Sequence, residues 1–223
     1  MPRATETSVL LSLDDEPWRP SQRLYTLAAD LATLTPRIKH RRLGARPSPG
    51  PRWFETFPGE HYHLLTALSM LLRPAIVWEF GTDTGMSAVA LSEGDALARV
   101  ITVDLVPWRT ISSTWFSEED FDDDRICQVV SDMASPALFE AGGECLTLAE
   151  LIFVDGPKDG RTEPPFLELL GAVPFTRNPI VVFDDIRVMN MVNVWRGIAR
   201  PKMDFTSYGH FTGTGIVDWC GTL

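Results

Sequence analysis

The sequence has few of the features that mark membrane, secreted or nucleic-acid-binding proteins. Its uninterrupted apolar runs are far shorter than the roughly 20 residues that cross a bilayer. Residues 1–18 contain too short an apolar core for a signal peptide. The net charge of −10 leaves little clustered positive charge for phosphates. We therefore expect a cytoplasmic protein that binds small molecules and neither nucleic acid nor membrane.

Cysteine and lysine are also scarce. Cys127, Cys145 and Cys220 make an odd number without a C-x-x-C spacing, so a disulfide framework or a thiolate zinc site has no support. Lysine occurs at only three positions, 39, 158 and 202. Lys158 stands out because it lies in "FVDGPKDG", beside two aspartates and just past an apolar run.

What the sequence does contain suits an α/β domain. Its 223 residues and 44% hydrophobic content are enough for a sizeable core. Short apolar segments alternate with helix-length segments from Pro74 onward, and their continuous hydrophobicity predicts parallel strands covered on both faces. The predicted strands are residues 75–80, 100–104, 126–130, 151–155 and 180–184.

The two ends of the chain differ from this pattern. A helix is predicted from Ser21 to Ile38, and the basic stretch 37–52 is expected to be a loop that is solvated or contacts acidic groups or a phosphate. A second helix is predicted from Gly59 to Leu72. Residues 188–199 predict a helix, followed by a closing pair of strands within 203–219. We treat residues 1–58 as a helical extension that could act as a lid, and residues 59–223 as the main domain.

A glycine-containing loop follows the first predicted strand and opens a helix. In "EFGTDTGMS", residues 79–87, Gly81 and Gly85 allow a sharp turn and a close approach to a ligand. Their spacing is not the G-x-G-x-x-G of dinucleotide-binding loops. Asp104 ends the next strand, where a carboxylate can accept both hydroxyls of a ribose. Ordinary packing glycines and a helix N-cap at Asp104 remain the alternatives.

These motifs resemble those of class I S-adenosylmethionine-dependent methyltransferases, within them the catechol O-methyltransferase-like group. The resemblance covers roughly Gly59 to Trp219 and implies a Rossmann-like, doubly wound, mostly parallel seven-stranded sheet with a C-terminal antiparallel hairpin. By the same resemblance, Asp132 would accept from the adenine amino group, while Asp83 would point to solvent. The implied cofactor-binding residues are Glu79, Gly81, Thr82, Gly85, Ser87, Asp104, Leu105, Ser131, Asp132, Met133 and Asp155.

Aspartates at two further strand ends predict a cation site. Because the ends of neighbouring parallel strands lie close together, Asp155, Asp184 and Asp185 are expected to converge on Mg²⁺ or a similar divalent cation. The resembled family has asparagine in place of Asp185. The alternative for Asp185 is a cap on the next helix.

The remaining predicted catalytic residues are Lys158 and His210, with Asp155. Lys158 matches the family's proposed catalytic lysine, and a base role requires neighbouring positive charge to lower its pKa. Its alternative is a surface ion pair with Asp159. His210 could reach the acceptor or serve as a structural hydrogen-bond partner.

Other histidines and aromatic residues are weaker candidates. His61 and His63, two apart on a helix, are not expected to share a metal site. Trp53, Phe54 and Phe57 could form a lid over an aromatic acceptor or pack within the N-terminal segment. Trp115 lies in an insertion after the second predicted strand, where such enzymes often differ.

The expected function is methyl transfer from S-adenosylmethionine to a hydroxyl of a small molecule, assisted by a metal. The alternatives are a metal-independent methyltransferase acting on a hydroxyl, carboxyl or amine, and a catalytically inactive binding subunit. A nicotinamide dehydrogenase is disfavoured by the loop spacing and the terminal hairpin. A homodimer is one expected assembly.

Overall fold

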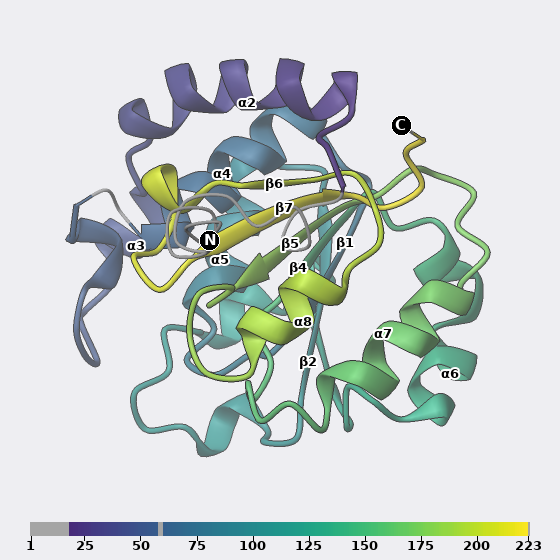
Figure 1. Cartoon of the computed structure of the whole chain (residues 1–223). Coiled ribbons are helices and arrows are strands. Elements are labelled where there is room, and N and C mark those ends of the chain that lie inside the picture. The colour runs from purple at the N-terminus through teal and green to yellow at the C-terminus, as the bar shows by residue number, and fades with distance from the viewer. Residues whose placement is uncertain (1–17, 58–59, 223) are drawn as a thin grey trace, which may run out of the picture.

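We describe the protein from a computed structural model, which covers residues 18–57 and 60–222. A seven-stranded sheet forms its centre, in the order β3-β2-β1-β4-β5-β7-β6 (Figure 1). Strands β1 to β5 are parallel, and β7 runs antiparallel to both β5 and β6. This confirms the predicted fold class. The strands are β1 Ile76–Phe80, β2 Arg99–Asp104, β3 Ile126–Val130, β4 Leu151–Val154, β5 Ile180–Asp184, β6 Lys202–Asp204 and β7 Thr214–Asp218.

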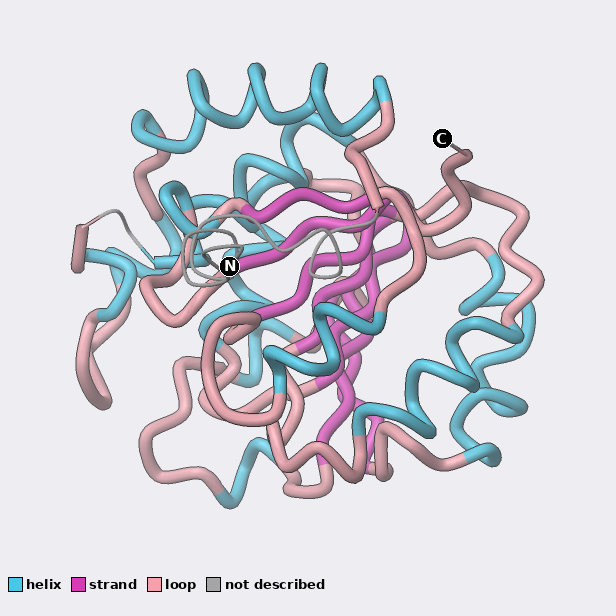
Figure 2. The backbone as a smooth tube through the Cα atoms, in the orientation of Figure 1, coloured by secondary structure: helices cyan, strands magenta, loops and turns pink. Residues whose placement is uncertain are grey.

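Helices cover both faces of the sheet, as Figure 2 shows by colour. Alternate strand residues face opposite ways: Val77 and Phe153 join the core under α2, α4 and α5, whereas Trp78 and Val154 join the core under α6, α7 and α8. Burial on both faces explains the continuous apolar runs. The helices are α2 Gln22–Leu34, α3 Arg41–Ala45, α4 Glu60–Leu72, α5 Met86–Gly94, α6 Pro136–Thr147, α7 Glu163–Ala172 and α8 Met191–Gly197.

Helix boundaries differ from the predictions where local chemistry ends a helix early. Helix α2 begins at its N-cap Ser21 as predicted but ends at Leu34, before a 3₁₀ turn that contains Pro36. The basic stretch predicted as a loop contains the short helix α3. Helix α8 is shorter than the predicted helix. The predicted start at Gly59 lies outside the described residues.

The segment before α4 packs into the main core. Leu24, Leu31 and Phe54 are buried in the same cluster as residues of α4 and α5. Ser21 Oγ also donates to Asp218 Oδ2 of β7 at 2.6 Å. The predicted boundary between residues 58 and 59 falls outside the described residues, so the domain division stays a prediction. Within residues 18–57 and 60–222, no helix is long and apolar enough to cross a membrane.

Candidate active site

Two cavities open at the carboxyl ends of the parallel strands, where the strand order reverses between β1 and β4. One, of about 290 Å³, is lined by residues that follow β1 to β4. The other, of about 440 Å³, is lined by His61, Lys158, Asp184 and His210 among others. Asp155 lines both cavities. We call the first the cofactor cavity and the second the acceptor cavity.

The cofactor cavity brings together most of the residues predicted to bind the cofactor. It lies over the ends of β1, β2, β3 and β4, because each contributes the residues directly after its last paired position. Predicted residues in its lining are Gly81, Asp104, Leu105, Ser131, Asp132, Met133 and Asp155. Four predicted residues, Glu79, Thr82, Gly85 and Ser87, are not in that lining.

Both loop glycines are required by their surroundings. Gly81 has a φ of 109°, and a Cβ there would lie 2.1 Å from the Asp155 carbonyl oxygen. Gly85 has a φ of 81°, and a Cβ there would lie 2.4 Å from the Phe116 ring. Packing therefore accounts for both glycines, which was the alternative to a role in ligand binding. Gly81 in addition lines the cofactor cavity, whereas Phe116 covers Gly85.

Asp104 fastens the glycine loop rather than capping a helix. Its Oδ2 accepts from the Thr82 and Asp83 amides at 2.9 and 3.1 Å, and its Oδ1 accepts from the Val106 amide at 3.0 Å. The next 3₁₀ turn has Pro107 at its N-cap, so the capping alternative is wrong. A carboxylate offers about four lone-pair sites. Asp104 therefore retains room for one further hydroxyl in this arrangement.

The residues after β3 close the far side of the cofactor cavity. The Ser131 amide donates to the Asp104 carbonyl at 2.9 Å, which ties this turn to the end of β2. Asp132 is exposed and accepts from the Ala134 amide at 2.8 Å, and Met133 is buried. Asp83 is exposed, as predicted. A polar edge and an apolar floor suit a flat heterocycle with an amino group.

Glu79, the next-to-last residue of β1, is a fully buried carboxyl group. Neither oxygen has a hydrogen-bond partner of normal geometry among the described residues. Burial raises the pKa of Glu79 to about 8, although the nearby hydroxyls of Ser87 and Thr102 act to lower it. A buried acid without partners is costly, so it suits a positively charged ligand group. The orphaned Glu79 oxygens and the side-chain-free face of Gly81 both fit S-adenosylmethionine.

The three predicted metal-binding aspartates do converge. One oxygen from each of Asp155, Asp184 and Asp185 lies within 4.8 Å of the others. Lys158 Nζ lies 2.5 Å from Asp155 Oδ1 and 2.7 Å from Asp185 Oδ2. The alternative interpretations of Lys158 and Asp185 are therefore wrong. Lys158 does not pair with Asp159, and the N-cap of α8 is Asn190 rather than Asp185. Asp159 is exposed.

Backbone geometry marks this cluster as a constrained region. Lys158 and Asp185 both have a φ of 60°, in the left-handed region that side chains other than glycine rarely adopt. Such conformations cost on the order of 1–3 kcal/mol each and gather at functional sites. The turn after β4 thus holds the Lys158 ammonium between two carboxylates at an energetic cost.

The charges in the cluster fix the protonation of its members. Burial would lower the pKa of Lys158, but the carboxylates of Asp155 and Asp185 outweigh burial and raise that pKa. Burial, and then the charge of Asp184, raises the pKa of Asp155. Burial would raise the pKa of Asp184, yet His61 and His210 hold it below its usual range. Lys158 is therefore charged at neutral pH, and its predicted base role requires a cation that takes over its carboxylate partners.

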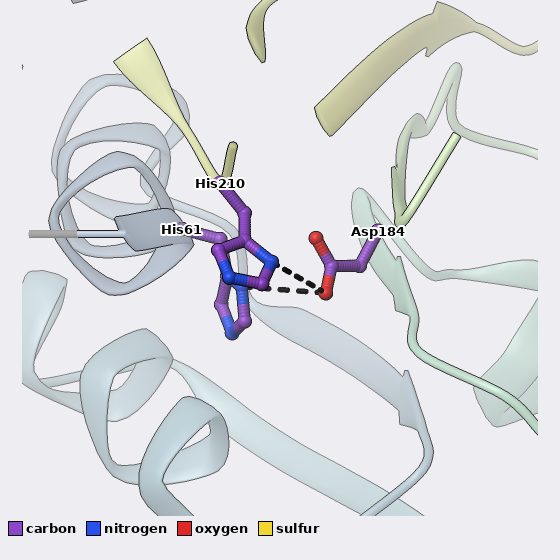
Figure 3. A group of neighbouring side chains, drawn as sticks. All are labelled: His61, Asp184 and His210. Carbon is purple, nitrogen blue, oxygen red and sulfur yellow. Dashed lines mark ion pairs between the residues drawn. The ribbon is translucent and has the colours of Figure 1, made fainter. Parts of the chain in front are cut away.

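Two histidines complete the cluster, and one of them was missed from the sequence. His61 Nδ1 and His210 Nδ1 lie 3.5 and 3.8 Å from Asp184 Oδ2 (Figure 3). Burial would lower the pKa of His61, but Asp184 raises it. His63, two residues further along α4, contacts His40 instead, with ring centroids 5.0 Å apart and the rings tilted by 36°. His61 and His63 therefore contact different partners.

Two segments that are distant in sequence, one before α4 and one after β2, line the acceptor cavity. Trp53 and Trp115 line it, whereas Phe54 belongs to the core and Phe57 is 94% exposed. The segments are tied together by the basic stretch. Arg42 and Arg46 each place a guanidinium nitrogen 2.5 Å from Oδ1 of the buried Asp120.

No family profile and no curated protein sequence matches this chain. Solved structures do match over most of it. The SAH-bound methyltransferase PaMTH1 of Podospora anserina is 16% identical, with a TM-score of 0.58 over 91% of this chain and 98% of that one. A putative caffeoyl-CoA O-methyltransferase of Staphylococcus aureus is 14% identical, with a TM-score of 0.53 over 70% and 80% of the two chains. CalS11, a TDP-rhamnose 3′-O-methyltransferase of calicheamicin biosynthesis, is 15% identical, with a TM-score of 0.51 over 91% and 97%.

These matches establish the fold. The chain has the fold of class I S-adenosylmethionine-dependent O-methyltransferases, which confirms the resemblance predicted from its glycine loop and strand ends. At such low identity a shared fold does not carry residue roles or substrates across. Activity must therefore be argued from the two cavities.

Proposed function

We propose that the protein transfers a methyl group from S-adenosylmethionine to a hydroxyl of a small molecule. The observation that carries this proposal is that the cofactor and acceptor cavities meet at Asp155. Methyl transfer is an in-line displacement, so donor and acceptor must approach one point from opposite sides. The arrangement at Asp155 supports such an approach.

The cofactor cavity supplies complementary groups for the adenosine part of S-adenosylmethionine, which when bound provides an electrophilic methyl group. The Asp104 carboxylate can accept from a ribose hydroxyl, and Met133 with the exposed Asp132 can hold the adenine ring. Outside the cavity lining, the buried acid Glu79 can compensate the positive charge of the ligand.

At the junction, Asp155 is the group placed to receive the proton of the acceptor. Its pKa is raised by burial and by Asp184, which makes it a stronger base than an ordinary aspartate. As long as no cation occupies the aspartate cluster, Lys158 donates to Asp155 Oδ1 and so orients the carboxylate while leaving Oδ2 for the acceptor. His210 lines the same cavity, where it can contact the acceptor.

Metal assistance is part of the proposal. A divalent cation held by Asp155, Asp184 and Asp185 would lower the pKa of an acceptor hydroxyl. The donor set fits, because the ligand oxygens are within 4.8 Å of one another and Asp184 Oδ1 is buried without a hydrogen-bond partner in the described chain. Binding at these three residues requires Lys158 to leave Asp155 and Asp185.

The proposal is tested with tritium-labelled S-adenosylmethionine and a panel of phenols, catechols and sugars, with products identified by mass spectrometry. Label on an acceptor oxygen is the expected result. Label on nitrogen or carboxyl, or activity unchanged by a chelator, favours the metal-independent alternative. Absence of cofactor binding by calorimetry at millimolar concentration favours an inactive binding subunit.

Two further points complete the proposal. All three cysteines, Cys127, Cys145 and Cys220, are free thiols, which supports a reducing compartment such as the cytoplasm. The partner is a small molecule, because the acceptor cavity of about 440 Å³ is within the range of small-molecule sites. A homodimer stays a prediction.

A further inference from the structure

Asp184 has two histidine neighbours, one of which, His210, also lies 3.7 Å from Asp185 Oδ1. They come from distant parts of the chain: His61 lies on α4, Asp184 ends β5, and His210 lies between β6 and β7 (Figure 3). One nitrogen or oxygen from each lies within 4.8 Å of the others. The two imidazole rings are nearly perpendicular, at 86°, with centroids 5.7 Å apart. Both rings therefore direct an edge toward the same carboxylate.

The donor atoms are buried and incompletely satisfied. His61 is 4% exposed and Asp184 is 3% exposed. Neither His61 Nδ1 nor Asp184 Oδ1 has a hydrogen-bond partner within the described ranges. Buried polar atoms without partners are rare in folded proteins and call for a ligand or an ion.

The spacing of these atoms suits a shared metal ion better than direct hydrogen bonds. Both nitrogens lie farther from Asp184 Oδ2, at 3.5 and 3.8 Å, than a normal N–H···O bond of about 2.9 Å. Two donors that each lie about 2.1 Å from a metal at a tetrahedral angle are about 3.4 Å apart. The observed spacing is close to that value.

We propose that His61, Asp184 and His210 bind a divalent transition-metal ion. Imidazole nitrogens favour Zn²⁺, Co²⁺, Ni²⁺ or Fe²⁺, whereas Mg²⁺ prefers sites made of oxygen ligands. Three protein ligands leave coordination positions open, and all three residues line the acceptor cavity. A ligand oxygen in that cavity can reach the open positions.

This site requires less rearrangement than a site made of the three aspartates. Lys158 can stay between Asp155 and Asp185, because the histidines approach Asp184 separately. Two existing contacts of His210 Nδ1 must change: Thr212 Oγ1 lies 2.6 Å away and Asp185 Oδ1 lies 3.7 Å away. A hydroxyl group can rotate to release that nitrogen.

The test is a Co²⁺ titration of the tag-free full-length protein, followed by visible d–d absorption, without S-adenosylmethionine or acceptor. Binding is measured apart from methyl transfer, so failure of one proposal does not affect the other. We expect one Co²⁺ per chain, retained against about 100-fold excess Mg²⁺. His61→Gln and His210→Gln should each weaken Co²⁺ binding at least about 10-fold.

The matched control is His63→Gln, on the same helix but against His40, which should leave the Co²⁺ affinity unchanged. If His61→Gln unfolds the protein, His210→Gln is decisive, because His210 is only partly buried. Co²⁺ binding no tighter than Mg²⁺ would overturn the proposal. A second pattern of results would also overturn it: Co²⁺ binding that persists in His210→Gln but is lost in the double variant Asp155→Asn, Asp185→Asn. The ion would then be bound by the three aspartates.

Discussion

The cofactor cavity and the acceptor cavity are built in different ways. The cofactor cavity is lined by short turns that directly follow β1 to β4, such as Gly81 and Ser131–Met133. The acceptor cavity shares the glycine loop after β1 and the start of α5, but most of it is assembled from α4, the turns after β4 and β5, the β6–β7 connection, the N-terminal segment and the insertion after β2. The first depends on local sequence and sheet topology, and the second on tertiary packing.

Cofactor binding and acceptor choice therefore depend on different parts of the chain. A ligand that many enzymes share can be bound by a recurring local arrangement, in which glycines and acidic residues directly follow parallel strands. Acceptor choice would depend on segments such as those carrying Trp53 and Trp115, which can vary without disturbing the sheet. Variants on each side, and at their junction, can test this separation.

The largest effect is expected at the junction. Asp155→Asn should reduce kcat about 10²–10⁴-fold, because it removes the proposed proton acceptor. Binding of S-adenosylmethionine, measured by calorimetry, should change far less. Asp122→Asn, an exposed carboxylate in the insertion, is the control. Undiminished turnover in Asp155→Asn would show that Asp155 is not the base.

On the cofactor side, Gly81→Ala should reduce the free energy of unfolding by about 3 kcal/mol, because a methyl group would strike the Asp155 carbonyl at a positive φ. Urea denaturation measures this loss. Gly197→Ala is the matched control, because nothing lies within 4 Å of a Cβ at that position. Equal stability of the two variants would refute the close approach at Gly81.

On the acceptor side, Asp120→Asn should reduce the free energy of unfolding by about 2 kcal/mol, since it weakens the buried partner of Arg42 and Arg46. The KM for the acceptor should rise while cofactor affinity stays constant. Glu119→Gln, an exposed neighbour, provides the comparison. A change confined to cofactor affinity would break the proposed separation of the two sides.

The final effect, smaller per pH unit than the losses above, is a pH dependence set by Glu79. Its pKa is about 8 in the folded protein against an ordinary 4.5, so between these values the folded state holds a proton that the unfolded state has lost. Stability therefore falls as pH rises through that interval, by at most about 1.4 kcal/mol per pH unit, and levels off above it. Glu79→Gln should remove this part of the slope in denaturation curves measured across pH. Identical slopes in wild type and variant would contradict it.

The sequence predicted the fold, and seven of the eleven residues expected to bind the cofactor line one cavity. Apolar runs ending in aspartate located β2, β4 and β5, and the glycine loop follows β1 as predicted. Local patterns also placed Asp155, Asp184 and Asp185 together, because neighbouring parallel strands end at the same edge. What could be predicted follows from sheet geometry.

The acceptor side could not be predicted in the same way. His61 reaches Asp184 only because α4 packs against the sheet, and its i, i+2 spacing from His63 gave no sign of that partner. Lys158 turned toward Asp185, a residue on another strand end, rather than toward its neighbour Asp159. Contacts between distant segments carry no local signature in a single sequence.

The most direct test of the central claim is a crystal structure with S-adenosylhomocysteine and a hydroxylated acceptor. The adenine is expected beside Met133, the ribose on Asp104, and the sulfur facing the acceptor oxygen across Asp155. Either ligand bound elsewhere, for example in the separate cavity of about 510 Å³ between His40, Phe54 and Tyr208, would refute this arrangement.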